Sequence, residues 1–118
     1  MSGDTVRSEE ISFDDFLKVR MITGTIVEAR VNPKARVPAF VIDIDFGPHG
    51  RRRSSAQLTG NYTPDALAGK QIVAVTNFPS KRIAGVKSEV LILGAVSDTH
   101  GVVLLEPTFP VENGARIG

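Results

Sequence analysis

Apolar and polar residues alternate along much of the chain, which is typical of β-strands that cover a core with one face. The clearest example is residues 39–46, in which Phe or Ile occupies every even-numbered position and two odd-numbered positions are Asp. Shorter alternating stretches predict strands at residues 25–31 and 53–58. The first half of the chain therefore predicts three strands whose apolar faces share one core.

The second half of the chain contains longer apolar runs. Residues 71–76 and 89–96 are apolar at nearly every position, which predicts strands that are buried on both faces. A turn at residues 98–101 leads into the apolar residues 102–105 and predicts a β-hairpin. The tail at residues 107–118 keeps several large apolar side chains, so we expect it to pack against the domain.

Two short helices are predicted from their end signals. Ser12 can cap a helix over residues 12–19, with Asp15 placed to reach back to the cap. A Thr-Pro pair followed by Gly predicts a second helix of one or two turns within residues 63–69. Residues 1–10 are polar and lack periodicity, so we expect a disordered tail there.

Several short strands, with one small helix between the third and the fourth, describe an OB-fold, an all-β five-stranded Greek-key barrel. The N-terminal helix and additional C-terminal strands are expected as extensions of this barrel. The chain has 118 residues, of which 42% are hydrophobic and 23% are charged, and this suits one domain with one core. We therefore expect a single domain over residues 11–118.

The composition and the apolar runs indicate in which cellular compartment the protein is expected. Cysteine is absent, so neither disulfides nor thiolate chemistry is expected. The first residues lack the apolar segment of a signal peptide, and the apolar run around Val90 is too short to span a bilayer. These features predict a cytoplasmic protein without membrane insertion.

The charge of the chain is unevenly distributed. Its net charge is +1, but residues 1–15 hold five acids and one base, which leaves a net charge of +5 for the rest. The bases of this remainder concentrate at Arg51, Arg52 and Arg53 and again at Lys81, Arg82 and Lys87. Such a footprint suits electrostatic capture of a polyanion, although a solvated basic surface would show the same pattern.

No catalytic constellation stands out. His49 and His100 both lie in Gly-containing turns, where two surface histidines are favoured over a catalytic pair that would need the turns to meet. Asp43 and Asp45 share one strand face and could form a carboxylate pair, but the solvated face of a half-buried strand is the favoured interpretation. Two histidines without cysteine make a zinc site improbable. We expect a binding protein that is not an enzyme and that has no metal or cofactor.

The segment after the strand at residues 71–76 is the best candidate for a nucleic-acid contact. Aromatic residues make up only 6% of the chain, and the spacing of most phenylalanines, including Phe13 and Phe16, indicates core positions. Phe78 differs because polar and basic residues surround it. It could stack on a base, with Asn77 reading a base edge, or it could plug the end of the barrel.

Several spaced motifs also resemble a known family. They are Thr23 to Ala29, Asn32 to Arg36, Tyr62 to Leu67, Val75 to Pro79 and Ile83 to Glu89. In this order they are similar to the tRNA-binding domain, which occurs in some methionyl-tRNA synthetases, in the phenylalanyl-tRNA synthetase β chain and in a human cytokine precursor. The resemblance covers about residues 13–118 and implies an OB-fold that binds tRNA.

Three further stretches resemble the stand-alone bacterial members of that family in particular. They are Arg36 to Ala39, Ser54 to Gln57 and Pro110 to Arg116. This subgroup implies a homodimer and an export-chaperone role, with unfolded preproteins and the SecA translocase as partners. The chain departs from many family members where His-Pro is replaced by Asn32-Pro33, so RNA contacts in this stretch could differ.

The resemblance also implies that Asn77, Ser88 and Glu89 lie near the ligand groove. Ser88 and Glu89 could instead form a structural pair that holds the neighbouring loop, and Arg51 to Arg53 could be only a charged hairpin. The predicted RNA-binding residues are Asn77, Phe78, Lys81, Arg82, Lys87, Ser88, Glu89, Arg51, Arg52 and Arg53. The predicted dimer interface comprises Phe13, Phe16, Leu17, Phe109 and Val111. A tRNA-binding module is the favoured function, and a peptide-binding export chaperone is the alternative.

Overall fold

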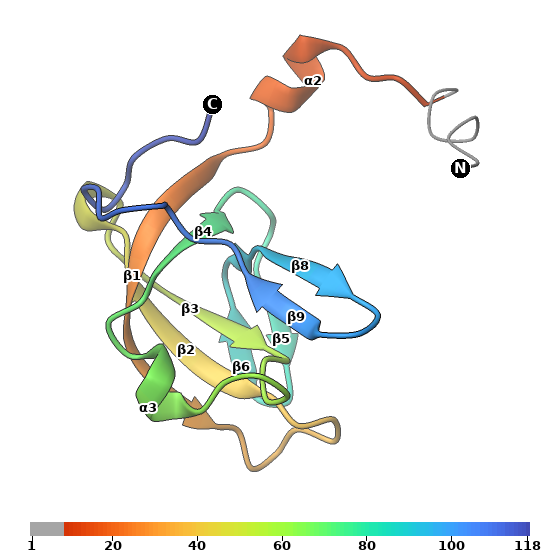
Figure 1. Cartoon of the computed structure of the whole chain (residues 1–118), viewed down its shortest axis with the longest axis vertical. Helices are drawn as coiled ribbons and strands as arrows, with labels where there is room; N and C mark the ends of the chain where they lie inside the picture. Colours follow the sequence, from red (N-terminus) through yellow and green to blue (C-terminus); the bar gives the residue numbers. More distant parts are fainter. Residues whose placement is uncertain (1–8) are drawn as a thin grey trace.

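Five strands form one antiparallel sheet that curls into a nearly closed barrel (Figure 1), which confirms the predicted all-β OB-fold. The computed structural model describes residues 9–118, so most of the predicted disordered tail lies outside the described residues. The order of the strands across the sheet is β3 (Arg51–Ala56), β2 (Phe40–Asp45), β1 (Met21–Val31), β4 (Gln71–Val75) and β7 (Leu91–Ile92).

Strands β5 (Lys81–Ile83) and β6 (Val86–Ser88) form a hairpin. The barrel closes where β3 meets the residues that directly follow β6. The backbone N–H of Glu89 donates to the carbonyl of Arg53 over 2.7 Å. The hydroxyl of Ser54 donates to the Val90 carbonyl over 3.1 Å. These bonds join the first edge of the sheet to its last and hold the barrel without a continuous strand pair.

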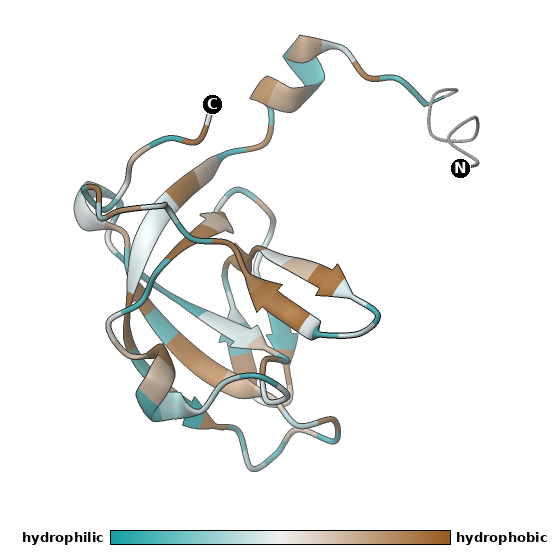
Figure 2. Ribbon diagram, in the orientation of Figure 1, coloured by the Kyte–Doolittle hydropathy of each residue, from teal (hydrophilic) through white to brown (hydrophobic). Residues whose placement is uncertain are grey.

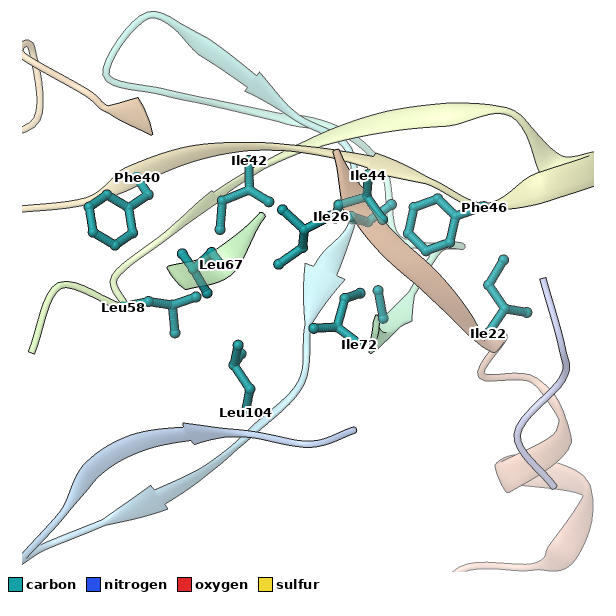
Figure 3. Packing of buried hydrophobic residues seen from close by; sticks show 12 residues of the cluster. Ile22, Ile26, Phe40, Ile42, Ile44, Phe46, Leu58, Leu67, Ile72 and Leu104 are labelled. Carbon is teal, nitrogen blue, oxygen red and sulfur yellow. The ribbon is translucent and has the colours of Figure 1, made fainter. Parts of the chain in front are cut away.

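The core fills the barrel with the apolar face that the alternation predicted. Phe40, Ile42 and Ile44 of β2 and Phe46 just after it are buried together with residues of β1 and β4 (Figure 3). Gly24 of β1 leaves room for this packing, because a Cβ there would lie 2.6 Å from the ring of Phe46. A glycine inside a strand is therefore required here by close approach of a core side chain.

Both predicted helices are present. In α2 (Phe13–Leu17) the Ser12 hydroxyl and the Asp15 carboxylate form the reciprocal capping box. In α3 (Pro64–Leu67) the Thr63 hydroxyl accepts from the backbone of the third helical residue, and Leu67 is buried in the barrel core. None of the helices within residues 9–118 is long and apolar enough to cross a membrane.

Helix α2 stands apart from the barrel (Figure 1) and buries none of its residues. The predicted core position of Phe13 is therefore wrong within this chain, since 71% of Phe13 is exposed. Phe16 is half-buried and lies outside the core cluster, so its predicted core position is wrong as well. The two residues are three positions apart on one helical face, and their rings stack with centroids 6.0 Å apart. The spacing defines the face but does not show what covers it.

The prediction of one strand over residues 89–96, buried on both faces, is also wrong. The run divides into β7 in the barrel and β8 (Gly94–Ser97), which pairs with β9 (Gly101–Leu104) in the predicted hairpin. Gly94 permits the change of partner, because a Cβ there would lie 2.8 Å from Val102. The hairpin extends beyond the core and leaves Val96 85% exposed. In Figure 2 most of β9 and part of β8 have the colour of hydrophobic residues.

The C-terminal tail packs against β1, as predicted. The Thr23 backbone N–H donates to the Ala115 carbonyl over 3.0 Å, and its carbonyl accepts from Gly114 over 2.8 Å. Only one bridge, between Ile22 and Arg116, has strand geometry. The additional C-terminal strands of this fold are therefore β8 and β9, while the tail runs alongside the barrel as an irregular segment.

Candidate nucleic-acid interface

The predicted basic residues gather around the outer face of β3 and the adjoining β5–β6 hairpin. Arg51, Arg52, Arg53 and Lys87 line one open hollow of about 500 Å³, together with Glu28, Asp43 and Glu89. Lys81 lines a second hollow of about 300 Å³, and Glu89 borders both. The two hollows are thus neighbours, and the fold brings together two basic clusters that are about 30 positions apart in the sequence.

The second hollow has an apolar wall. Phe78, Ile83 and Leu91 line it and are exposed, with 55% of Phe78 accessible. Phe78 lies outside the buried core, so the structure does not place it as a plug of the barrel. Its exposed position beside Lys81 matches the alternative in which the ring face is open to a ligand.

Asn77 has a structural task in the described part of the chain. Its Oδ1 accepts from the backbone N–H of Arg20 over 2.9 Å, and its Nδ2 donates to the Lys18 carbonyl over 2.7 Å. These bonds fix the segment between α2 and β1 to the end of β4. The amide that was predicted to read a base edge is therefore already engaged with backbone groups.

Ser88 and Glu89 likewise bond to β3. The Ser88 hydroxyl accepts from the Ser55 backbone N–H over 3.0 Å, and the Glu89 carboxylate accepts from the Arg53 N–H over 3.1 Å. Ser88 is buried, whereas Glu89 borders both hollows. This geometry matches the structural alternative, in which the pair holds the hairpin against the barrel.

The three arginines of β3 differ in their surroundings. They begin β3, which follows β2 after the short helix at residues 47–49 and pairs with it as a hairpin. Arg53 contacts Asp43, with Nε 2.7 Å from Oδ1, and Arg30 contacts the same carboxylate over 3.2 Å. Neither Arg51 nor Arg52 pairs with an acid within residues 9–118. Arg53 is therefore largely neutralised, while Arg51 and Arg52 are available to an anion.

The two arginines shift the titration of Asp43. Partial burial by itself would raise the pKa of Asp43, but the hydrogen bonds and charges of Arg53 and Arg30 outweigh burial and lower that pKa below its ordinary value. The same contact raises the pKa of Arg53. Asp45 is engaged separately, since its Oδ1 accepts from the Gly47 N–H over 2.8 Å. The two aspartates therefore serve local structure on the strand face that the sequence predicted to be solvated.

Substitution of Asp43 gives a pH-dependent loss of stability. Because the pKa of Asp43 is depressed in the folded state, its contribution is present above the ordinary Asp pKa of 3.8 and is lost as pH falls through the lower folded value. Asp43→Asn should cost about 1 kcal/mol or less at pH 7, and the difference from the parent should shrink below about pH 4. Urea unfolding of the parent and the variant at pH 7 and below about pH 4 measures the difference in their free energies of unfolding. A difference that is the same at both pH values would contradict the prediction.

The turn of the β5–β6 hairpin was missed by the sequence analysis. No strand was predicted between residues 77 and 88, but Lys81 and Arg82 begin β5 and pair with Ser88 and Lys87. The two turn residues, Ala84 and Gly85, both have positive φ angles, 48° and 81°. Gly85 was the available signal, since a two-residue hairpin turn of this type favours Gly at its second position.

The five predicted dimer residues lie on α2 and the tail. Phe13 and Phe109 are each 71% exposed, and Leu17 and Val111 are also exposed. Phe16 and Leu17 line a small hollow with Arg116 and Ile117, so the helix and the tail are neighbours. Phe109 and Val111 line a different hollow, with Thr25 and Gln71, so the predicted dimer residues form two exposed apolar groups, one on α2 and one on the tail.

The histidines do not form a catalytic pair. His49 ends the short helix η1 (Gly47–His49), and His100 lies in the β8–β9 turn, on the opposite side of the barrel (Figure 1). Within residues 9–118 no group of three or more acidic, His or Cys side chains is arranged to hold a metal ion.

Comparison with known proteins gives consistent matches. Residues 21–116 match the family described as "Putative tRNA binding domain". The structure resembles the chaperone CsaA of Bacillus anthracis, with 50% identity, a TM-score of 0.88, and coverage of 92% of this chain and 99% of that one. CsaA of Picrophilus torridus shows 44% identity and a TM-score of 0.87, with coverage of 92% and 100%.

The curated relatives are larger proteins. The chain is 33% identical over 111 residues to a methionine–tRNA ligase of Porphyromonas gingivalis, and this match covers 93% of the chain. The chain spans only 16% of the length of that ligase. The similarity therefore concerns one domain of the ligase and does not extend to the whole enzyme.

Proposed function

Because the chain belongs to the tRNA-binding domain family, we propose that it binds tRNA through the β3 face and the β5–β6 hairpin, without catalysing a reaction. The family match confirms the resemblance that the sequence motifs indicated. The observation that carries the proposal is the junction of a basic hollow with an exposed aromatic side chain, Phe78, at one edge of the barrel.

The two hollows supply two kinds of contact. Arg51, Arg52 and Lys87 can neutralise phosphates, which gives affinity without sequence preference. Phe78 offers a ring on which an unpaired base can stack, and Pro79 restricts the backbone beside it. A loop that is already ordered loses less entropy on binding. The arrangement therefore favours a folded RNA with a phosphate backbone next to an exposed base.

Replacement of Phe78 tests the aromatic contact. Phe78→Ala should weaken tRNA binding by about 1–3 kcal/mol, roughly a 5- to 150-fold rise in Kd, because the stacked base loses its partner. Since Phe78 is half exposed, the variant should unfold at nearly the parent's temperature, whereas a core Phe→Ala change costs about 3–5 kcal/mol of stability.

Phe78→Leu is the matched control for that experiment, because it keeps apolar bulk and removes the ring. Stacking predicts that the Leu variant binds tRNA as weakly as the Ala variant in a filter-binding assay. If the Leu variant instead binds like the parent, Phe78 acts as a simple apolar contact. A parent chain with no measurable affinity for tRNA would overturn the proposed function itself.

A peptide-binding chaperone role is the second candidate. It is favoured by the CsaA chaperones among the similar structures and by the apolar wall formed by Phe78, Ile83 and Leu91. An extended peptide could lie along this wall with acidic side chains near Lys81. The proposed export partners, unfolded preproteins and SecA, rest on the family resemblance alone.

We further propose that the protein acts as a homodimer in the cytoplasm. The exposed apolar surface of α2 and the tail supports a two-fold contact, since both segments lack a partner within residues 9–118 that would bury Phe13 or Phe109. The cytoplasm is the compartment in which a protein of this kind meets tRNA and preproteins before their export.

A further inference from the structure

The loop between β1 and β2 is fixed to the tip of the β5–β6 hairpin by one buried side chain. Asn32 is only 6% exposed. Its Nδ2 donates to the carbonyl of Ala84 in the hairpin turn over 3.2 Å, and its Oδ1 accepts from the Lys34 backbone N–H over 3.0 Å. The same amide therefore joins the two segments and sets the backbone at Lys34.

This arrangement brings two cations to one glycine. Lys34 extends over Gly85, where an added Cβ would lie 3.4 Å from Lys34 Cδ and 3.7 Å from its Nζ. Arg82 reaches the same residue from the hairpin, and its Nη1 donates to the Gly85 carbonyl over 3.2 Å. Lys34 comes from the β1–β2 loop and Arg82 from strand β5. Neither the loop nor the β5–β6 hairpin alone could therefore place two cations at Gly85.

The two cations lack an acidic counterpart nearby. Among residues 9–118 no carboxylate lies within ion-pair distance of Lys34 or Arg82, whereas Arg53, Arg30, Lys18 and Lys70 all have acidic partners. Like charges held on one turn repel each other, and an anion between them would relieve that repulsion. Guanidinium and ammonium groups are the donors that suit phosphate oxygens.

We propose that Lys34 and Arg82 form a phosphate-binding clasp over the Ala84–Gly85 turn, which takes a phosphodiester of the RNA backbone. The clasp rests on the proposed tRNA-binding function and extends the interface from β3 to the β1–β2 loop. Lys34 contacts the ligand in this arrangement, and Asn32 is a positioning residue that acts through it. The backbone-held turn gives the clasp a fixed geometry before the RNA arrives.

Substitution of Lys34 tests the clasp. Lys34→Gln should weaken tRNA binding several-fold and reduce the slope of log K against log salt by about 0.7–0.9, the value of one phosphate contact. Lys34→Arg should restore both the affinity and the slope, because it keeps the charge. Since Lys34 is exposed, all variants should keep the parent's thermal melt.

Lys70→Gln serves as the control with equal charge change, because Lys70 already pairs with Glu106 at 3.8 Å. It should leave the salt slope unchanged. A Lys34→Gln variant that binds tRNA with the parent's affinity and slope overturns the clasp and leaves the proposed function standing. A parent that does not bind tRNA overturns both, and a Lys70→Gln variant that loses as much as Lys34→Gln shows that general charge, and not the clasp, is measured.

Discussion

The affinity of this protein for tRNA should fall by about two to three decades as monovalent salt rises from about 50 to about 200 mM. Besides Lys34 of the proposed clasp, the bases open to phosphate are Arg51, Arg52, Lys81, Arg82 and Lys87, none of which pairs with an acid within residues 9–118. Each phosphate contact releases condensed counterions, so about five to six contacts give a steep slope. Arg53 adds little because Asp43 already neutralises it.

Filter binding across this salt range measures the slope directly. The double variant Lys81→Ala with Arg82→Ala should flatten it by close to two contacts and leave the thermal melt nearly unchanged. A matched double variant, Lys18→Ala with Lys70→Ala, removes the same charge from lysines that are paired with Asp15 and Glu106. Binding that is flat across the range, or equal flattening by both double variants, would contradict an electrostatic interface on this hairpin.

The barrel could be predicted from sequence because its signal is local. The alternation at residues 39–46 specifies which face of β2 points into the core, and the structure buries Phe40, Ile42, Ile44 and Phe46 accordingly. Apolar character alone was less informative in residues 89–96. An apolar run shows that burial of its side chains would be favourable. It does not show whether other residues of the same chain pack against them, and Val96 remains exposed.

The site was harder to predict because its contacts are non-local. Asn77 was recognised as a polar residue at a strand end, but its partners Lys18 and Arg20 come from a segment more than 50 residues earlier. Lys34 lies in the motif from Asn32 to Arg36 but was not singled out, since its position over Gly85 depends on the fold and on buried Asn32. Residue type thus indicated the class of ligand, while tertiary contacts decided which bases are open to it.

The exposed apolar residues of α2 and the tail should hold two copies of the chain together. Helix α2 buries none of its residues, and the Phe13 and Phe109 side chains are both 71% exposed. An apolar surface of this kind is stabilised when a second copy covers it, and a two-fold contact lets the same residues serve both partners. The parent should therefore sediment as a dimer of the 12.7 kDa chain.

The double variant Phe13→Asp with Phe109→Asp should convert this dimer into a monomer at micromolar concentrations, because each interface would then bury four carboxylates without partners. Val37→Asp is the control: Val37 is also exposed and apolar, but it lies in the β1–β2 loop at the far end of β1 from α2 (Figure 1). It should leave the dimer intact.

Sedimentation equilibrium separates the outcomes. If the parent sediments with the mass of a single chain, 12.7 kDa, the proposed dimer is wrong. A double variant that stays dimeric instead places the two-fold contact elsewhere, and the exposed β8–β9 hairpin around Val96 then becomes the surface to substitute.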